Sequence, residues 1–205
     1  MTEPELGLRE RNRLEKQKKI SAAALALFSS KGVEATTLSE VARKAGVAKG
    51  TVFLYAPDKT DLIHLVMHDV LESTVDQAFA TLPKRVTLVP KLLHVFGELF
   101  RMYERNGSLG REFVRSLPGA TGPNAQRVNA LTFGFMHRVG GLILEAQGAG
   151  EVRADVPPLL VAQNVFALYF MGVMGWLGGM VSIEEALDPM LSSALGLLMT
   201  GIGKR

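Results

Sequence analysis

Apolar residues recur every three or four positions along most of this 205-residue chain, and no segment alternates apolar with polar residues over the length of a strand. A period of three to four residues places apolar side chains on one face of an α-helix, whereas a half-buried strand needs a period of two. The chain also lacks the internal repeat of a solenoid. We therefore expect an all-α fold of about nine helices. Gly, Pro and Asn-Gly breaks bound them at residues 9–30, 38–45, 49–55, 59–82, 86–105, 109–116, 124–147, 158–180 and 182–202.

The segment 36–62 holds two short helix patterns separated by a Gly-Val-Ala turn. Thr37 and Glu40 have the spacing of a capping box, in which a hydroxyl and a carboxylate satisfy backbone N–H groups at the start of a helix. Gly46 ends that helix, and Asp58 can cap the long helix that follows the second one. Two helices in this arrangement are typical of a helix-turn-helix, whose second helix enters the major groove of DNA.

The charge of the chain is concentrated in the same region. Residues 1–61 hold 11 Lys and Arg against 8 Asp and Glu, whereas residues 62–205 hold 12 of each, so the net charge of +3 lies beside the helix-turn-helix pattern. Residues 9–19 alone carry six basic residues against two acidic ones. A charge run is usually a solvated helix face, but next to a helix-turn-helix we interpret it as a phosphate-facing surface.

The sequence lacks the features that several other classes of protein require. It contains no cysteine, which excludes disulfides, thiolate metal sites and a cysteine nucleophile and is consistent with a reducing cytoplasm. The polar residues 1–19 do not form a secretion signal, and no Gly-x-Ser-x-Gly, Walker or dinucleotide-binding motif is present. We therefore expect a cytoplasmic protein that is not an enzyme, without catalytic residues and without a cofactor.

The Thr-Thr…Ala-Gly-Val…Gly-Thr pattern, followed by aromatic residues and by Lys59 and Leu62, resembles the signature of the TetR family of transcriptional repressors. The likeness is specific over about residues 10–65 and extends more loosely to the end through the helical layout. It implies a homodimer with a DNA-binding domain at residues 1–60 and a helical ligand-binding and dimerisation domain at residues 61–205. It also implies two other partners, palindromic operator DNA and a small-molecule effector.

The DNA contacts of the family carry over where the positions match. Thr37, Tyr55 and Lys59 suit phosphate contacts, which position a protein on DNA without reading its sequence. Lys49 and Thr51 are better placed to read base edges, because a lysine donates to guanine acceptors and a threonine methyl group can meet a thymine methyl group. The full set that the resemblance implies is Thr37, Ser39, Lys49, Gly50, Thr51, Phe53, Tyr55 and Lys59.

Two positions depart from the family pattern. Phe53 stands where the family often has tyrosine, so it lacks a hydroxyl for a phosphate contact. Ala56 stands where the family usually has phenylalanine, a side chain that packs the recognition helix against the fourth helix. The recognition helix is therefore expected to be held less rigidly than the family pattern implies.

The fourth expected helix carries a possible metal site. His64, His68 and Glu72 are spaced four residues apart, which places them on one face. Alternatively, they form the polar face of that helix, opposite an apolar stripe that includes Met67 and Val75. Because the set lacks a fourth ligand, we expect the polar face and no metal site.

Aromatic and methionine side chains are frequent in the C-terminal part of the chain. Most are expected in the core, but apolar pockets with a few polar groups are also typical of small-molecule sites. The resemblance places such a pocket among the fourth to eighth helices, which predicts an apolar or amphipathic effector. The candidate lining residues are Phe100, Tyr103, Phe133, His137 and Phe170, although His137 is also interpretable as a core histidine.

Residues 156–183 form an uncharged span of 28 positions. Its length and apolarity would satisfy a membrane helix, but a helix that is apolar on all sides is also found in a buried dimer interface. The span begins with two prolines and ends with several glycines, and a second apolar helix follows it. We therefore expect a homodimer through the two C-terminal helices and no membrane.

Together these features predict a ligand-responsive transcriptional regulator, most simply a repressor. Ligand binding in the C-terminal domain would move the fourth helix and change the separation of the two recognition helices, so that DNA fits only one state. Two alternatives remain at this point: a constitutive DNA-binding regulator without a ligand switch, and a membrane-anchored protein.

Overall fold

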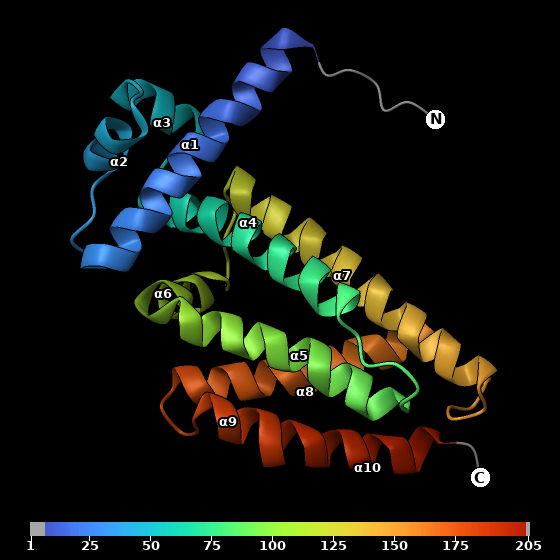
Figure 1. Cartoon of the computed structure of the whole chain (residues 1–205). Helices are drawn as coiled ribbons and strands as arrows, with labels where there is room; N and C mark the ends of the chain where they lie inside the picture. The colour runs from blue at the N-terminus through green and yellow to red at the C-terminus, as the bar shows by residue number, and fades with distance from the viewer. Residues whose placement is uncertain (1–6, 204–205) are drawn as a thin grey trace. The chain divides into compact units, whose positions relative to one another are not determined.

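The computed structural model describes residues 7–203, and most of them lie in helices (Figure 1). Within this range the only β-type pairing is an isolated bridge between Val152 and Gly203. The all-α prediction is therefore confirmed. The helices are α1 (Leu8–Lys31), α2 (Leu38–Ala45), α3 (Lys49–Tyr55), α4 (Lys59–Ala80), α5 (Leu88–Arg105), α6 (Gly107–Ser116), α7 (Pro123–Gly148), α8 (Pro158–Leu177), α9 (Ile183–Glu185), the π-helical stretch η1 (Ala186–Leu191) and α10 (Ser192–Ile202).

The last helix expected from the sequence is interrupted. α9, η1 and α10 follow one another without a loop, but Asp188 has a non-helical backbone (φ −141°, ψ 122°) immediately before Pro189. A proline removes one backbone donor and pushes the preceding residue out of helical geometry. The described residues therefore contain nine helical segments when this kinked C-terminal helix is counted once, in agreement with the prediction.

The chain divides into two compact units. The first contains the residues up to Asp69 together with Asn106–Arg127, and the second contains Val70–Arg105 together with the residues from Val128 onward. Consequently α1, α2, α3 and α6 lie in the first unit, whereas α4 and α7 each begin in the first unit and end in the second. The unit that contains the helix-turn-helix therefore also contains α6 and the first turns of α4 and α7.

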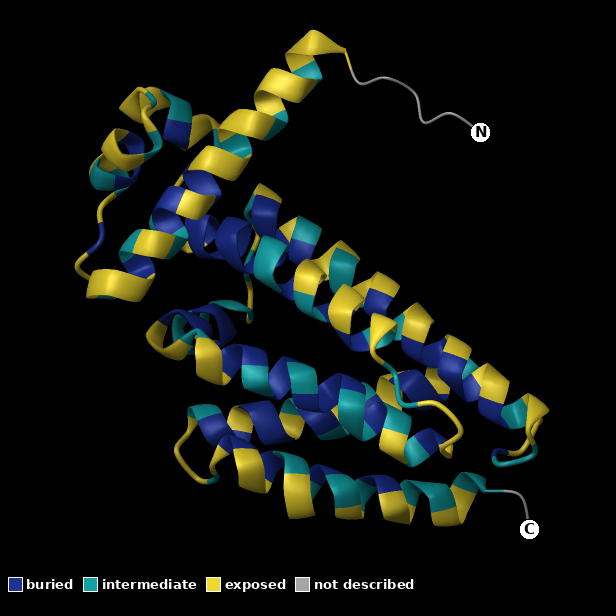
Figure 2. Cartoon of the chain, viewed as in Figure 1, coloured by how far each residue is buried: buried dark blue, intermediate teal, exposed yellow. Residues whose placement is uncertain are grey.

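The first unit has a small core built from one face of each helix. Ile20, Ala24 and Phe28 of α1 are buried, whereas the half of α1 before Ile20 is largely exposed (Figure 2). Val41 of α2 and Val52 of α3 complete this core from the helix-turn-helix.

The prediction that His64, His68 and Glu72 form an exposed polar face of α4 is wrong for the two histidines. His64 and His68 are 1% and 8% exposed, and only Glu72 lies at the surface. The reason is that the beginning of α4 is enclosed within the first unit: His64 contacts Ser116 at the end of α6, and His68 contacts Arg127 of α7. A sequence period cannot reveal that a helix is covered on both its apolar and its polar sides.

The second unit is filled by aromatic rings from α5, α7 and α8. The ring of Tyr169 lies 4.8 Å from that of Phe96 and 4.9 Å from that of Phe100, and the ring of Phe135 lies 5.5 Å from that of Phe96. Tyr103 stacks on the ring of Trp176 at 5.9 Å. Offset and edge-on ring pairs of this kind add to the stabilisation that apolar burial gives.

Candidate nucleic-acid interface

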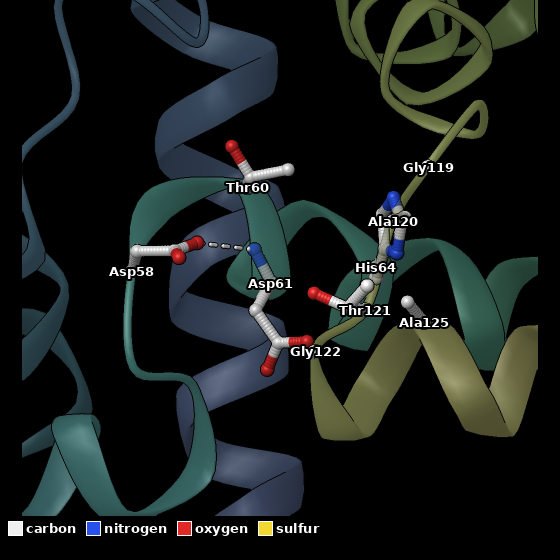
Figure 3. Close-up of a pocket in the computed structure, with 9 residues that line it drawn as sticks. All are labelled: Asp58, Thr60, Asp61, His64, Gly119, Ala120, Thr121, Gly122 and Ala125. Atoms are coloured by element: carbon white, nitrogen blue, oxygen red, sulfur yellow. Dashed lines mark hydrogen bonds between the residues drawn. The ribbon is translucent and has the colours of Figure 1, made fainter.

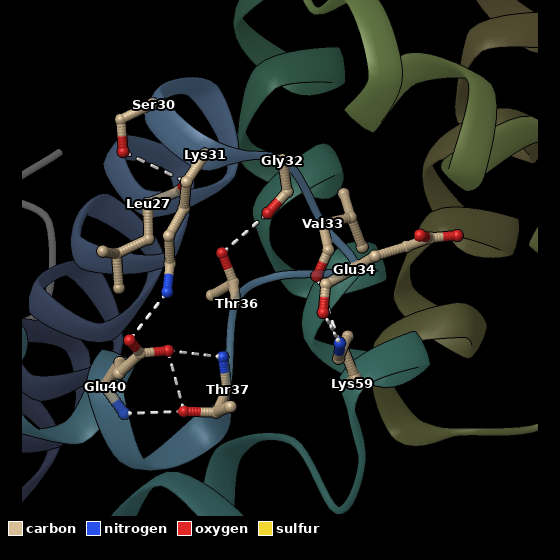
Figure 4. Close-up of polar contacts among 10 residues, drawn as sticks. All are labelled: Leu27, Ser30, Lys31, Gly32, Val33, Glu34, Thr36, Thr37, Glu40 and Lys59. Atoms are coloured by element: carbon tan, nitrogen blue, oxygen red, sulfur yellow. Dashed lines mark hydrogen bonds and ion pairs between the residues drawn. The ribbon is translucent and has the colours of Figure 1, made fainter.

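The capping box at the start of α2 is formed as the sequence predicts (Figure 4). The Thr37 hydroxyl accepts the Glu40 N–H at 3.3 Å, and Glu40 Oε2 accepts the Thr37 N–H at 2.9 Å. Lys31 at the end of α1 donates to the same carboxylate at 2.7 Å. The Lys31 ammonium and the two Thr37 donors lower the pKa of Glu40 to about 2. The carboxylate is thus charged at neutral pH, and it fixes the beginning of α2 against the end of α1.

The turn between α2 and α3 depends on Gly46. Its backbone is left-handed (φ 68°), and its N–H bonds to the carbonyls of Ala42 and Arg43. Glycine adopts this conformation without the steric penalty that a Cβ atom imposes. Helix α3 then runs over Lys49–Tyr55 and has the predicted bounds. The sequence places both helices correctly because their ends are fixed by local chemistry.

One face of α3 is open to solvent. Lys49, Gly50, Phe53 and Leu54 are exposed, Thr51 and Tyr55 are half-buried, and Val52 is buried. The Lys49 ammonium lies 5.9 Å from the centre of the Phe53 ring, within the range of a cation–π contact. Six of the eight predicted DNA contacts therefore lie on or at the start of two adjacent helices, α2 and α3, with Lys59 at the start of α4 and Thr37 preceding α2.

Leu54 is a surface residue of α3 that the sequence reasoning missed. Its side chain is 84% exposed near the end of α3. A large apolar side chain in that position can contact thymine methyl groups in a major groove. The signal was available in the sequence, because Val52 and Ala56 occupy the buried positions of this short helix and leave residue 54 on the opposite side.

All three predicted phosphate contacts already have partners within the protein, and the first of them, the Thr37 hydroxyl, donates to Glu40 Oε2 at 2.9 Å. The Tyr55 hydroxyl donates to the backbone carbonyl of Arg13 at 3.0 Å. The Lys59 ammonium donates to the carbonyls of Val33 and Glu34 at 3.1 and 2.9 Å (Figure 4). A lysine has three donors, so Lys59 keeps one for another acceptor, whereas a tyrosine hydroxyl has a single donor. Both side chains therefore hold the first unit together in addition to any role on DNA.

The basic residues of α1 lie on its exposed half. Arg9, Arg11, Lys16, Lys18 and Lys19 are all at the surface. Arg13 is also exposed, but it is paired with Glu10 at 2.6 Å. The positive surface expected from the charge count is therefore available to an anionic partner.

The comparison with known proteins agrees with this geometry. Residues 20–66, which span the helix-turn-helix, match the family described as "Bacterial regulatory proteins, tetR family". The chain is 24% identical over 187 residues to the Fatty acid metabolism regulator protein of Bacillus subtilis, covering 91% of this chain and 95% of the relative. Residues 20–66 are therefore a domain of the TetR family of transcriptional regulators.

Solved structures of TetR proteins share the fold. A TetR transcriptional regulator from Rhodococcus sp. RHA1 superposes with a TM-score of 0.71 and 23% identity, covering 91% of this chain and 97% of that protein. A TetR transcriptional repressor, Thermus thermophilus FadR in complex with lauroyl-CoA, superposes with a TM-score of 0.66 and 25% identity, covering 87% and 93%. The likeness therefore extends over both compact units and beyond the segment that the family signature covers.

The five residues predicted to line an effector site have different surroundings. Phe100 and Tyr103 are buried in the core of the second unit, and Phe170 is half-buried with its ring stacked on that of Phe166 at 6.2 Å. Phe133 is 56% exposed, and its ring contacts that of His137 at 4.4 Å on the surface of α7. The interpretation of His137 as a core histidine is therefore wrong.

A polar cavity of about 240 Å³ lies in the first unit beside the start of α4 (Figure 3). Asp58, Asp61 and His64 line it together with the loop Gly119–Gly122. Asp58 accepts the Asp61 N–H at 2.7 Å, which confirms it as the cap of α4. Burial lowers the pKa of His64, so its ring is neutral at physiological pH. Its Nε2 bonds to Ser116 Oγ at 2.8 Å, and its Nδ1 is buried without a protein partner.

Proposed function

We propose that this TetR protein is a ligand-responsive repressor that binds palindromic operator DNA as a homodimer. A small apolar or amphipathic effector releases it. The proposal rests on one observation above all: the exposed face of α3, held by a capped α2 and a glycine turn, lies in the same unit as the exposed basic half of α1. This combination supplies both groove readout and phosphate attraction.

The residues of the interface take distinct roles in this proposal. Lys49 and Thr51 read base edges, Gly50 lets the backbone approach the DNA, and Phe53 makes apolar contacts. Ser39 donates to phosphate from the first turn of α2. Thr37, Tyr55 and Lys59 contact phosphate as well, and the Tyr55 hydroxyl must exchange the Arg13 carbonyl for a phosphate oxygen to do so.

The effector proposal draws on the named relatives and on the second unit. One relative is a fatty acid metabolism regulator, and one structural neighbour is bound to lauroyl-CoA. An acyl thioester joins an apolar chain to a polar head group, which is the amphipathic chemistry expected from the sequence. We therefore propose a fatty acyl thioester as the effector class. Its candidate lining residues are Phe100, Tyr103, Phe133, His137 and Phe170.

The homodimer proposal rests on apolar side chains left at the surface of α8 and α10. These include Leu160, Met171 and Met174 of α8 and Leu197 of α10. Within the described residues α8 is the one helix long and apolar enough to cross a membrane, with 44% of its apolar stretch buried in the chain itself. Pairing of α8 and the C-terminal helix with a second copy would cover these side chains. We favour that dimer, in the cytoplasm, over a membrane anchor.

The proposed mechanism is a shift between two conformations. α4 begins beside the recognition helix and ends in the second unit, so a displacement of its far end can reach the helix-turn-helix. Two reading heads must lie roughly 34–36 Å apart, or a multiple of one turn, to fit successive major grooves. An effector that favours a different separation therefore weakens DNA binding by as much as its affinity differs between the two states.

The experiment is a selection of operator DNA from random duplexes by the purified full chain, followed by titration with lauroyl-CoA and stearoyl-CoA. We expect a palindromic sequence and release of DNA by at least one acyl thioester, with free coenzyme A as the negative control. A palindrome without release by any compound would favour a constitutive regulator. Absence of any selected sequence would refute the DNA-binding proposal.

A second measurement addresses the dimer and the membrane alternative. Light scattering of the purified chain in detergent-free buffer is expected to give the mass of two copies. Met171→Glu or Leu197→Glu should shift this mass toward one copy, because a charge would be buried in the interface. A chain that stays in solution only with detergent would instead support the membrane anchor.

A further inference from the structure

The end of the recognition helix is held by a residue that lies far away in the sequence. Tyr55 is the last residue of α3, and the carbonyl of such a residue has no partner within its own helix. Asn124, in the first turn of α7, donates its Nδ2–H to this carbonyl at 2.7 Å. The following residue, Ala56, is fully buried, so water does not replace this bond readily. A side-chain amide thus caps α3 from another helix.

The same side chain is fixed on α4. The backbone N–H of Asn124 donates to Asp61 Oδ1 at 3.0 Å, and its Nδ2 donates to Asp61 Oδ2 at 2.7 Å. Asn124 Oδ1 accepts from Arg127 at 3.2 Å. Both N–H groups and the oxygen of the amide are therefore used. The opposite orientation would turn the oxygen toward two other acceptors, so the network permits only one orientation of the amide.

The contact lies in the interior of the first unit. Asn124 is 4% exposed and Asp61 is 3% exposed. A buried carboxylate needs hydrogen-bond donors, and Asn124 supplies two to Asp61. The approach of the loop before α7 is close: a Cβ atom on Gly122 would lie 2.0 Å from Asp61 Oδ1. Glycine at position 122 is thus what allows α7 to begin against α4 here.

Further bonds extend this network toward α1. Arg127 lies 3.3 Å from His68 Nδ1, and His68 Nδ1 lies 3.4 Å from Asp69. Asp69 in turn accepts from the Ser21 hydroxyl at 2.7 Å. His68 Nδ1 accepts from Arg127 in one tautomer or donates to Asp69 in the other. The first turn of α7 is therefore bonded directly to α3 and α4, and α4 is bonded to α1 through Asp69 and Ser21. All these residues belong to the first unit, whereas α7 continues into the second.

We infer that Asn124 is a positioning residue that passes a displacement of α7 to the recognition helix, independently of the covalent path through α4. This inference rests on the proposed ligand-responsive function. It also offers a replacement for the packing contact that is missing at Ala56. The family usually holds the end of α3 with an aromatic side chain at this position, and here the hydrogen bond from Asn124 holds it. Loss of Asn124 should therefore loosen α3 and uncouple DNA binding from the effector.

The first test follows the position of α3 without DNA or effector. Because the chain has no cysteine, Leu54→Cys and Gln126→Cys place two spin labels at exposed positions of α3 and α7. An excess of unlabelled chain restricts the measured distances to one copy. Double electron–electron resonance measures the distance between the two labels, and we expect a narrow distribution for the otherwise unchanged chain. Asn124→Ala should broaden this distribution. Asn129→Ala, which changes an exposed asparagine on the same helix, should leave it unchanged. An unchanged distribution in Asn124→Ala would overturn the inference.

The second test measures coupling. The rise in Kd for operator DNA caused by lauroyl-CoA should shrink about fivefold or more in Asn124→Ala, while the Kd for lauroyl-CoA in the absence of DNA stays at its wild-type value. A purely structural role would lower the melting temperature and leave this ratio intact, which would contradict the inference. If lauroyl-CoA does not release the wild-type protein, the effector proposal fails, and the spin-label result still decides the role of Asn124.

An exchange variant separates the two bonds. Asp61→Asn combined with Asn124→Asp restores a hydrogen bond between α4 and α7 with the donor reversed. Residue 124 then has no donor for the Tyr55 carbonyl. We expect this pair to stay folded but to melt below the wild type, because two acceptors then face each other, and to show the broadened distribution. A narrow distribution in a stably folded exchange variant would show that the bond to Tyr55 does not position α3.

Discussion

The first compact unit fixes its short helices with polar groups, whereas the second fills its interior with aromatic rings. In the first unit Thr37, Asp58 and Asn124 each satisfy backbone or side-chain groups at a helix end. In the second unit the ring of Tyr169 contacts those of Phe96 and Phe100. Hydrogen bonds specify orientation, and apolar burial supplies most of the free energy of folding.

This difference between polar helix ends and an aromatic interior agrees with the function proposed for each unit. A surface that reads DNA must present α3 in one orientation, which directional bonds at its ends provide. A unit that binds an apolar effector and a second copy needs apolar surface that can repack, and rings and methionines supply it. The comparison therefore predicts that substitutions in the second unit affect stability most, whereas substitutions in the first affect DNA binding most.

The largest expected effect concerns Phe100, a predicted ligand-lining residue that is fully buried. Phe100→Ala should lower the free energy of unfolding by about 3–5 kcal/mol, because it removes a large core side chain and leaves a cavity. Phe133→Ala, at a position 56% exposed, is the matched control and should change it little. Urea denaturation measures both. Equal losses would mean that Phe133 is covered in solution, for example by a second copy.

The next effect concerns base readout. Lys49→Ala should weaken binding to the selected operator by about 1–3 kcal/mol and leave binding to random DNA nearly unchanged, because it removes a base contact. Lys18→Ala, on the exposed half of α1, should weaken binding to both DNAs alike and lower the slope of log K against log salt by about 0.9. Fluorescence anisotropy at several salt concentrations measures both. Parallel losses for Lys49→Ala would refute its reading role.

A smaller effect compares the two capping boxes, one in each unit. Thr37→Ala and Ser182→Ala each remove a hydroxyl that caps a helix, so both should lower the free energy of unfolding by about 1 kcal/mol. Only Thr37→Ala should also weaken operator binding, since Thr37 precedes the first helix of the helix-turn-helix. Thermal denaturation and anisotropy check the two parts. Weaker DNA binding in Ser182→Ala would show that the units are coupled through α9.

The smallest effect is a pH dependence in the first unit. Burial lowers the pKa of His64 below its ordinary value of 6.5, so the unfolded chain binds a proton more readily than the folded one. Stability from this group is present above about pH 6.5 and is lost as the pH falls through that value toward the folded pKa. His64→Gln should flatten the fall in melting temperature between pH 7 and pH 5, roughly the range where a histidine titrates. An unchanged slope would assign it to another group.

The sequence predicted the helix-turn-helix closely because its boundaries are set by neighbouring residues. A capping threonine, a left-handed glycine and a proline act over one helical turn, and α2 and α3 have the bounds expected from them. The same reasoning failed for His64 and His68, whose spacing indicates one shared face but not what covers that face. One of its two interpretations of His137, as a core histidine, also failed, because this side chain lies at the surface beside Phe133.

The sequence by itself predicted the helices, the family resemblance and the segment proposed to face DNA, since periodicity, capping and charge are local properties of the chain. Only the tertiary structure revealed that Asn124 caps the end of α3 from 69 residues away, and that Tyr55 and Lys59 are already bonded within the protein. Such contacts depend on which segments pack together. Packing pairs hydrogen-bond donors and acceptors that are distant in sequence, so these pairs cannot be predicted from residue spacing along the chain.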